Sequence, residues 1–147
     1  MTALHKKLNG DIVENNTDQL KTILKNKDIR ISHQRLLVLD YLIKNPIHPS
    51  AEIIFKDLKD IDPLISQATV YNTLNLFVEK NLVKELDFNM TSKRYEFIKE
   101  SHGHFVCTSC GQIIDLCLED LNYSIDLLDY SIDSVDITYR GLCPDCR

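Results

Sequence analysis

Apolar residues recur at helical spacing in four runs before residue 80 of the chain. Each run begins beside a residue whose side chain can cap the first turn of a helix. These capping residues are Thr17 or Asn16 for the first run, and Ser32, Ser50 and Ser66 for the others. The pattern predicts four short helices with these apolar residues on their inner faces: Leu20, Ile23 and Leu24; Leu36, Leu39 and Ile43; Ile53, Ile54 and Leu58; Val70, Leu74, Phe77 and Val78.

The ends of these helices are also indicated by the sequence. The second and third runs stop before Pro46 and Pro63, and the residue that precedes a proline disfavours helical backbone. Asn81 is suited to the left-handed position that closes the fourth helix. Residues 1–16 are polar and lack periodicity, so we interpret them as an N-terminal arm.

After the fourth run the helical period gives way to alternation, which is typical of strands. Residues 82–88 and 93–98 form two such runs, separated by four residues that suit a turn. Helices followed by a β-hairpin predict a winged helix-turn-helix, in which the third and fourth helices are the helix-turn-helix and the hairpin is the wing. We therefore expect an N-terminal DNA-binding domain over residues 1–98.

Residues 99–147 predict a different, β-β-α-β arrangement. Short strands are expected at 105–107 and 112–116, and a last strand where Val135, Ile137 and Tyr139 alternate. Between them, a helix is expected with Leu118, Leu121, Ile125 and Leu128 on one face. A unit of about fifty residues buries little surface alone and commonly dimerises. The fold class is therefore α+β, a winged helix followed by a small α/β dimerisation domain.

Charge and composition narrow the class of protein. The net charge of the 147-residue chain is −5, but residues 1–98 carry +1 and residues 99–147 carry −6. Only the first part can approach DNA without strong repulsion. The N-terminus lacks the apolar stretch of a signal peptide, and no apolar run reaches membrane-spanning length. We expect a cytoplasmic protein without a membrane partner, in which cysteines stay reduced.

Two Cys-x-x-Cys pairs carry the clearest chemistry, Cys107 with Cys110 and Cys143 with Cys146. Two such turns can place four thiolates tetrahedrally around one Zn²⁺ ion. Paired disulfides or a redox-active dithiol are the alternatives. A structural zinc would fasten the last strand to the first hairpin of the small domain. Cys117 has no partner at this spacing, so we expect a small buried hydrophobic side chain.

His102 and His104 precede the first cysteine pair, and Asp115 follows it. A tetrathiolate site is already full, so these residues must serve another metal or none.

These motifs together resemble the ferric uptake regulator family over residues 17–146. The resemblance rests on Ser-Gln-Ala-Thr-Val-Tyr-Asn-Thr-Leu from Ser66, on His-x-His before Cys-x-x-Cys-Gly, on Asp115, and on the terminal Cys-x-x-Cys. It implies a homodimeric, metal-dependent repressor that binds double-stranded DNA at an inverted-repeat operator. It implies structural zinc on Cys107, Cys110, Cys143 and Cys146, and a sensory metal on His48, Glu96, His102, His104 and Asp115.

The resemblance also implies which residues read DNA. Tyr71 is expected at base edges, Arg30 in the minor groove, and Asn72 at adenine or the DNA backbone. Tyr71 could instead be a core aromatic, but Val70 and Leu74 already fill the inward face of its helix.

The sequence indicates the inducing signal less specifically than it indicates the ligands. Three imidazoles and two carboxylates suit Fe²⁺, Mn²⁺ or Zn²⁺. Glu96 resembles iron-sensing members of the family, whereas Asn72 resembles peroxide-sensing members. Ser101 and Gly103 stand where some members have further histidines, so one sensory site per subunit is expected. We expect an iron-responsive repressor, with peroxide, zinc or manganese sensing as the alternative.

Two other classes fit parts of the sequence. Two histidines and a carboxylate also occur in non-haem iron oxygenases, and a zinc-stapled domain can be a pure interaction module. The sequence contains no signal of a substrate pocket and no obvious set of general bases, so an enzyme is not expected.

Overall fold

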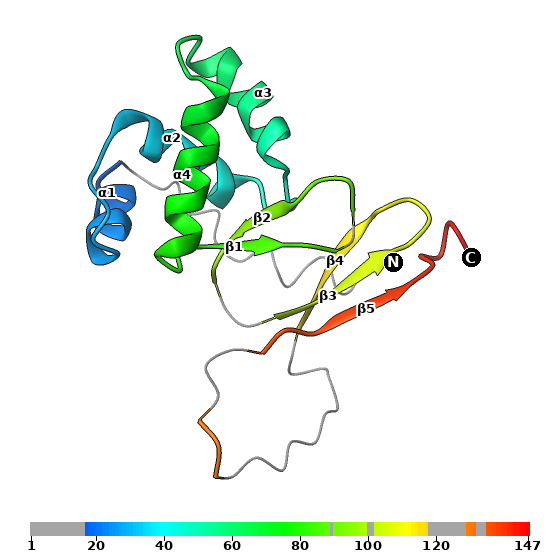
Figure 1. Ribbon diagram of the computed structural model, residues 1–147. Helices are drawn as coiled ribbons and strands as arrows, with labels where there is room; N and C mark the ends of the chain where they lie inside the picture. Colours follow the sequence, from blue (N-terminus) through cyan, green and yellow to red (C-terminus); the bar gives the residue numbers. More distant parts are fainter. Residues whose placement is uncertain (1–16, 89, 100–101, 118–128, 132–134) are drawn as a thin grey trace. The chain divides into compact units, whose positions relative to one another are not determined.

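The computed structural model describes residues 17–88, 90–99, 102–117, 129–131 and 135–147 (Figure 1). The chain divides into two compact units. The N-terminal unit comprises Met1–Leu86 and Arg94–Phe97, and the C-terminal unit comprises Asp87–Lys93 and Ile98–Arg147.

The N-terminal unit contains four helices and a hairpin. The helices are α1 (Thr17–Asn26), α2 (His33–Lys44), α3 (Ala51–Ile61) and α4 (Gln67–Glu79). Three of them begin at a predicted cap: the hydroxyls of Ser32, Ser50 and Ser66 accept the backbone N–H groups of Arg35, Ile53 and Thr69. These oxygens satisfy amide groups that have no partner within the first turn of a helix.

Asn81 closes α4 in the left-handed conformation, as predicted, with φ of 53°. The N–H of Leu82 donates to the carbonyl of Phe77 at 2.9 Å, and that of Asn81 to Val78 at 3.0 Å. This pair of bonds is the Schellman motif, which satisfies the last carbonyls of a helix. The same motif ends α1, with Asp28 at φ of 54°.

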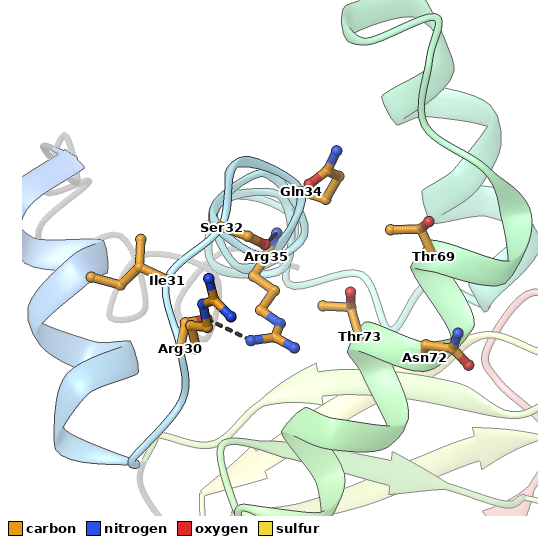
Figure 2. Close-up of a pocket in the computed structure, with 8 residues that line it drawn as sticks. All are labelled: Arg30, Ile31, Ser32, Gln34, Arg35, Thr69, Asn72 and Thr73. Atoms are coloured by element: carbon orange, nitrogen blue, oxygen red, sulfur yellow. Dashed lines mark hydrogen bonds between the residues drawn. The ribbon is translucent and has the colours of Figure 1, made fainter.

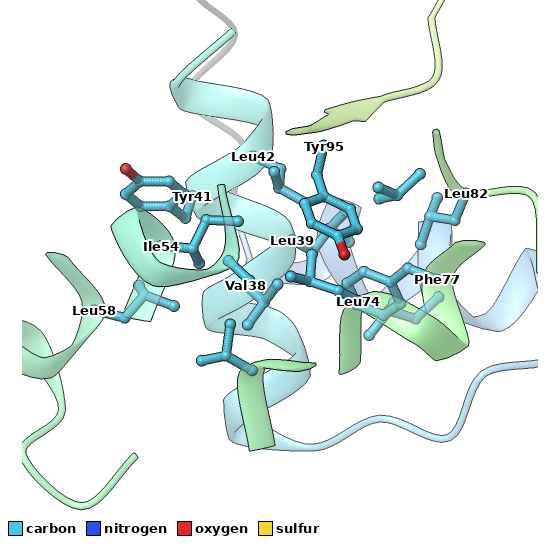
Figure 3. Packing of buried hydrophobic residues seen from close by; sticks show 14 of the residues in the cluster. Val38, Leu39, Tyr41, Leu42, Ile54, Leu58, Leu74, Phe77, Leu82 and Tyr95 are labelled. Atoms are coloured by element: carbon cyan, nitrogen blue, oxygen red, sulfur yellow. The ribbon is translucent and has the colours of Figure 1, made fainter. Parts of the chain in front are cut away.

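The core of the N-terminal unit forms where the inner faces of its helices meet (Figure 3). The predicted residues Leu24, Leu39, Ile54 and Leu74 are all buried there. Ile53 was expected inward as well, but it is 38% exposed, so that prediction was wrong. Ile54 and Leu58 lie four residues apart on the buried stripe of the helix. Ile53 precedes Ile54 by one residue, so its side chain points to one side of that stripe.

The hairpin pairs β1 (Val83–Leu86) with β2 (Arg94–Phe97) in antiparallel register, with Val83 opposite Phe97. It confirms the predicted wing after the α3–α4 helix-turn-helix, although both strands are shorter than expected. Val83 and Tyr95 are buried and belong to the apolar core of the unit. The wing is therefore anchored on the helices by side-chain packing.

The C-terminal unit contains β3 (His102–Cys107), β4 (Ile113–Cys117) and β5 (Thr138–Gly141). The strand order is β4-β3-β5, with β4 antiparallel and β5 parallel to β3. β3 starts three residues before the predicted strand, so the His-x-His motif lies within it. Paired strands on both sides extend β3 because they satisfy the backbone groups on each of its edges.

The last strand starts later than predicted. Val135 and Ile137 precede β5, although the Ile137 carbonyl accepts the N–H of His104 at 2.9 Å. The predicted helix carrying Leu118, Leu121, Ile125 and Leu128 lies outside the described residues, as does the N-terminal arm. Among the helices of the described ranges, none has the length and apolar character needed to cross a membrane.

Candidate metal centres and nucleic-acid interface

The four cysteines of the two Cys-x-x-Cys pairs form one cluster within the C-terminal unit. One sulfur from each lies within 4.8 Å of all the others. The Sγ atoms of Cys110 and Cys143 are 3.8 Å apart. Tetrahedral Zn²⁺ with Zn–S bonds of ~2.3 Å holds its sulfurs ~3.8 Å apart, whereas a disulfide needs ~2.05 Å. The cluster therefore has the donor set and spacing of a structural zinc site.

Local backbone geometry closes both cysteine turns and favours the thiolate form of Cys107. Each cysteine pair closes a turn: Gly111 N–H donates to the Cys107 carbonyl, and Cys146 N–H to the Cys143 carbonyl, both at 3.0 Å. The backbone N–H groups of Cys110 and Cys143 point at the Cys107 sulfur and lower its pKa to about 6. Because thiolates are the metal-binding form, this environment favours coordination by Cys107. Hydrogen bonds with neighbouring thiols instead raise the pKa of Cys110 and of Cys146.

Cys117 differs from its prediction. It is exposed at the end of β4, opposite His102 in the strand pairing, and it lies outside the four-cysteine cluster. The expectation of a buried side chain was wrong because β4 is an edge strand of the described sheet.

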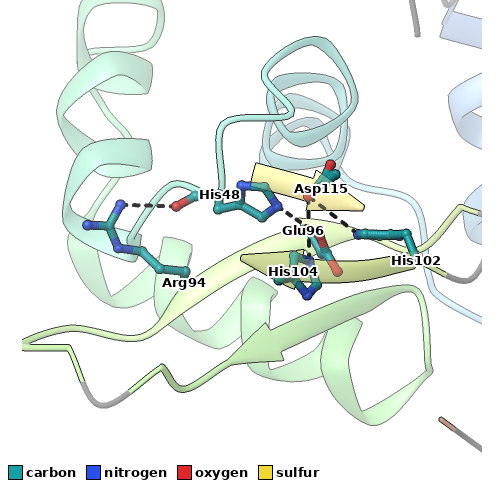
Figure 4. A network of polar contacts seen from close by, with 6 residues as sticks. All are labelled: His48, Arg94, Glu96, His102, His104 and Asp115. Carbon is teal, nitrogen blue, oxygen red and sulfur yellow. Dashed lines mark hydrogen bonds and ion pairs between the residues drawn. The ribbon is translucent and has the colours of Figure 1, made fainter. Parts of the chain in front are cut away.

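His48 and Glu96, which we call the N-terminal pair, meet within the N-terminal unit (Figure 4). Nε2 of His48 lies 3.1 Å from Oε2 of Glu96. His48 has a left-handed backbone, with φ of 55°, which is uncommon for a residue with a side chain. Unusual backbone of this kind concentrates at functional sites.

Strand β2 holds the His48 loop in place. The Arg94 guanidinium donates to the carbonyl of His48 at 3.1 Å, and the N–H of Tyr95 donates to the carbonyl of Pro49 at 3.0 Å. Arg94 and Glu96 lie two residues apart, on one face of β2. That face therefore contacts both the backbone and the imidazole of His48.

His102, His104 and Asp115, which we call the strand triad, lie in the C-terminal unit (Figure 4). His104 pairs directly with Asp115 across β3 and β4, and His102 is two residues away on the same face. Oδ1 of Asp115 lies 3.7 Å from Nε2 of His102 and 3.6 Å from Nε2 of His104.

The strand triad is partly enclosed by a residue that the sequence did not single out. The Phe88 ring meets the His104 ring edge to face, with centroids 5.3 Å apart, and the Phe88 carbonyl accepts the Arg140 guanidinium at 2.8 Å. Arg94 and Phe88 thus support the ligand candidates. Alternation along the wing could have placed Arg94 beside Glu96, but no local pattern connects Phe88 with His104.

Ligand atoms bound to one ion at ~2.1 Å lie roughly 3.0–3.4 Å apart. The contact within the N-terminal pair falls in that range, and those within the strand triad are slightly longer. Each set offers imidazole nitrogen and carboxylate oxygen, the donors that Fe²⁺, Mn²⁺ and Zn²⁺ accept.

Two of the three predicted DNA-contacting residues line a polar groove on the N-terminal unit (Figure 2). Arg30 precedes α2 and Asn72 belongs to α4, and the hollow between them has a volume of about 410 Å³. Arg35 also lines this groove and donates to the Arg30 carbonyl at 2.6 Å. None of the lining residues carries a carboxylate, so the groove suits an anionic backbone.

Tyr71 is neither fully buried nor fully exposed. Its ring is half-buried and packs partly against the apolar core, while its hydroxyl donates to the Glu52 carboxylate on α3. It does not line the groove formed by Arg30 and Asn72. Glu52 was not singled out by the sequence, because the two residues of this contact lie nineteen positions apart on different helices.

Comparison with known proteins places these features in one family. The model of the ferric uptake regulator family matches residues 26–130. The peroxide-responsive repressor of Staphylococcus saprophyticus is 33% identical over 142 residues, which cover 93% of this chain and 95% of that protein.

Solved structures agree with this match. The Campylobacter jejuni peroxide stress regulator has a TM-score of 0.65 and 30% identity, covering 88% of this chain and 97% of that one. The Helicobacter pylori ferric uptake regulator, described as having three functional metal-binding sites, has a TM-score of 0.67 and 25% identity. That comparison covers 88% of this chain and 89% of the Helicobacter chain.

Proposed function

Because the chain belongs to the ferric uptake regulator family, we propose that it is a metal-dependent, DNA-binding transcriptional repressor. The observation that carries the proposal is that metal-ligand candidates are assembled in both units. The N-terminal pair lies in the unit that contains the helix-turn-helix, and the strand triad lies in the unit that contains the cysteine cluster.

The cysteine cluster holds structural zinc in this proposal. Cys107, Cys110, Cys143 and Cys146 bind the ion and fasten β5 and the chain end to the β3–β4 turn. The observed sulfur spacing supports this role. Zinc binding in such a site contributes directly to folding.

The regulatory ion is held by His48, Glu96, His102, His104 and Asp115. The ion supplies a shared coordination centre, and the residues from each unit orient their own unit toward it. In a two-fold dimer, the resulting angle between the units sets the separation of the two α4 helices and thereby the match to an inverted-repeat operator. Metal affinity and DNA affinity are then reciprocally coupled.

Residues 1–98 serve as the DNA-binding domain, in which α4 enters the major groove. Tyr71 and Asn72 face base edges or the DNA backbone from that helix, and Arg30 reaches the minor groove. The groove between Arg30 and Asn72 supports this assignment, since its charged side chains are arginines.

Residues 99–147 serve as the dimerisation domain. The described part of the C-terminal unit exposes several large apolar side chains. They include Ile114, Tyr130, Tyr139 and Leu142. Exposed apolar side chains on a small unit support the assignment of this surface as one that a second copy of the chain covers.

Iron is the favoured inducing signal, because iron-sensing members of the family usually have glutamate at the position of Glu96. A peroxide response is the second candidate, and the similarity to the peroxide-responsive repressor of Staphylococcus saprophyticus favours it. In that case the same five residues would hold iron, which would supply electrons to hydrogen peroxide, and oxidation of a ligand histidine by that reaction would weaken metal binding.

Operator binding measured against metal tests the proposal. Purified dimer is incubated with duplex DNA selected from a random pool, with Fe²⁺, Mn²⁺ or Zn²⁺ or with a chelator, and is then challenged with hydrogen peroxide. A repressor binds an inverted repeat only with metal. Loss of binding with Fe²⁺ but not with Mn²⁺ after peroxide identifies a peroxide sensor.

The same titration separates the other two classes. An interaction module binds no duplex under any metal condition. An oxygenase consumes oxygen with Fe²⁺ and a small-molecule substrate, and its metal dependence does not extend to DNA.

A further inference from the structure

The hydrogen bond between Tyr71 and Glu52 lies wholly within the N-terminal unit and on its proposed DNA-reading helix. Tyr71 lies in the first half of α4, and Glu52 lies in the first turn of α3. The Glu52 carboxylate repels DNA phosphates, so its presence beside Tyr71 lowers the affinity of this helix for DNA of any sequence. A favourable role of Glu52 must therefore concern something other than nonspecific affinity.

Both partners are held in position by other contacts. The hydroxyl of Ser50 caps α3 by accepting the Ile53 N–H at 3.3 Å, and the Pro49 carbonyl accepts the Tyr95 N–H at 3.0 Å. These bonds fix the backbone that carries Glu52. The Tyr71 ring is held by its partial packing against the apolar core. The phenol and the carboxylate therefore meet without a large loss of side-chain freedom.

The direction of this hydrogen bond is set by the charges. The hydrogen bond from Tyr71 lowers the pKa of Glu52, and the positive charge of Arg94 adds to that effect. The same hydrogen bond raises the pKa of Tyr71. At neutral pH the carboxylate is therefore the acceptor and the phenol keeps its proton and donates it.

A phenol whose proton is engaged in this way can only accept a further hydrogen bond. In the major groove, adenine presents an amino donor beside its N7 acceptor, cytosine presents an amino donor, and thymine presents a methyl group beside its O4 acceptor. Guanine presents only acceptors, O6 and N7. The Tyr71 oxygen is thus compatible with the first three and is repelled by guanine.

We propose that Glu52 is a positioning residue that determines sequence specificity. It fixes Tyr71 as a hydrogen-bond acceptor and apolar contact, and so disfavours guanine at the base position that Tyr71 faces. The inference rests on the proposed function, because it requires Tyr71 to contact operator DNA. Glu52 acts through Tyr71 and needs no contact with DNA itself.

A purely structural role for the same bond predicts a different outcome. If Glu52 only tied α3 to α4, its loss would weaken binding to every operator variant by the same factor. A change in base preference at one position separates the two roles.

The test measures the affinity of the full-length dimer, loaded with zinc and Mn²⁺, for a set of duplexes. The starting operator is selected from random DNA, and each base of one half-site is then replaced in turn by the other three. Tyr71→Ala first locates the base that Tyr71 faces, because the penalties for substitution at that base shrink. Glu52→Ala and Glu52→Gln are then compared with the parent at the same base.

In the parent, guanine at that base should lower affinity by roughly 5- to 150-fold. In Glu52→Ala the phenol proton is released to donate to guanine O6 or N7, so most of this penalty should disappear. Glu52→Gln retains an acceptor oxygen and should keep most of the penalty. Glu79→Ala removes an exposed carboxylate from the end of α4 and should match the parent's base preference.

Two results would overturn the inference while leaving the proposed function intact: an unchanged guanine penalty in Glu52→Ala, or an equal loss of affinity for all duplexes. If Tyr71→Ala alters no base preference, Tyr71 is not a base contact and the inference fails with it. If the parent binds no duplex in response to metal, the proposed function itself fails. Melting curves of all variants confirm that they are folded.

Discussion

Buried apolar side chains are distributed unequally between the two units. The core cluster, from Leu20 to Tyr95, belongs entirely to the N-terminal unit. In the described part of the C-terminal unit, two of the buried residues are the zinc-ligand candidates Cys107 and Cys143. Large apolar residues such as Tyr130 and Tyr139 are more than half exposed there.

This difference indicates that the two units reach stability by different physical routes. The N-terminal unit buries enough apolar surface in contacts among its own elements, and helix caps add to this. The described part of the C-terminal unit instead combines strand pairing with a metal-binding cluster and exposed apolar residues. Its folding should therefore depend on zinc and on a second copy of the chain, and the folding of the N-terminal unit should not.

Cys146→Ser should have the largest effect and should confine it to the C-terminal unit. Structural zinc contributes about 10–16 kcal/mol of apparent binding energy in small zinc domains, and that energy is folding energy. We expect loss of bound zinc, measured by elemental analysis, and dissociation of the dimer in sedimentation experiments. Cys117→Ser is the matched control and should retain both zinc and dimer. A Cys146→Ser variant that stays dimeric with an unchanged melting curve contradicts the zinc assignment.

Phe77→Ala should do the converse, destabilising the N-terminal unit alone. Phe77 is fully buried in the core, and the cavity left by its removal should cost about 3–5 kcal/mol. Hydrogen exchange should accelerate in α2 and α4 while zinc content stays the same. Leu64→Ala removes a side chain that is 91% exposed and should change neither quantity. Release of zinc by Phe77→Ala would show that the two units do not fold independently.

His48→Ala tests whether the two units communicate through the regulatory metal. The variant should keep its zinc, its fold and some metal binding by the strand triad, but should lose metal-dependent operator affinity, a coupling of ~1–3 kcal/mol. The measured quantity is the ratio of operator affinities with saturating Mn²⁺ and with chelator. His33→Ala, at an exposed histidine of the same unit, should keep the parent's ratio. A parental ratio in His48→Ala would remove His48 from the mechanism.

Ser50→Ala should have the smallest effect and sharpens the picture of local stabilisation in the N-terminal unit. Its hydroxyl accepts the N–H of Ile53 at 3.3 Å, and loss of such a cap costs about 1 kcal/mol. The expected result is a slightly lower free energy of unfolding in denaturant titrations, with unchanged zinc content. A loss of several kcal/mol would mean that Ser50 also supports the neighbouring His48 loop.

Features that depend on a few neighbouring residues were predicted correctly from the sequence. Ser32, Ser50 and Ser66 cap helices, and Asn81 closes α4, because a cap needs only its own side chain and the next turn. The cysteine pairs were similarly readable from their spacing.

The incorrect predictions concern features that depend on the tertiary environment of a residue. Ile53 and Cys117 are apolar enough to be buried, yet both are exposed. Ile53 lies just beside the buried stripe of α3, and Cys117 ends an edge strand. The starts of β3 and β5 were misplaced because a strand extends as far as its neighbours provide backbone partners.

The sequence by itself therefore determined the four N-terminal helices and the hairpin that follows them, the family resemblance and the types of ligand available. Only the tertiary structure decided that His48 adopts a left-handed backbone against Glu96 and Arg94, that Phe88 packs on His104, and that Tyr71 donates to Glu52. The physical reason is the distance along the chain over which each interaction acts. Periodicity and capping act within a few residues, whereas these contacts join segments far apart in the chain and form only once packing has brought those segments together.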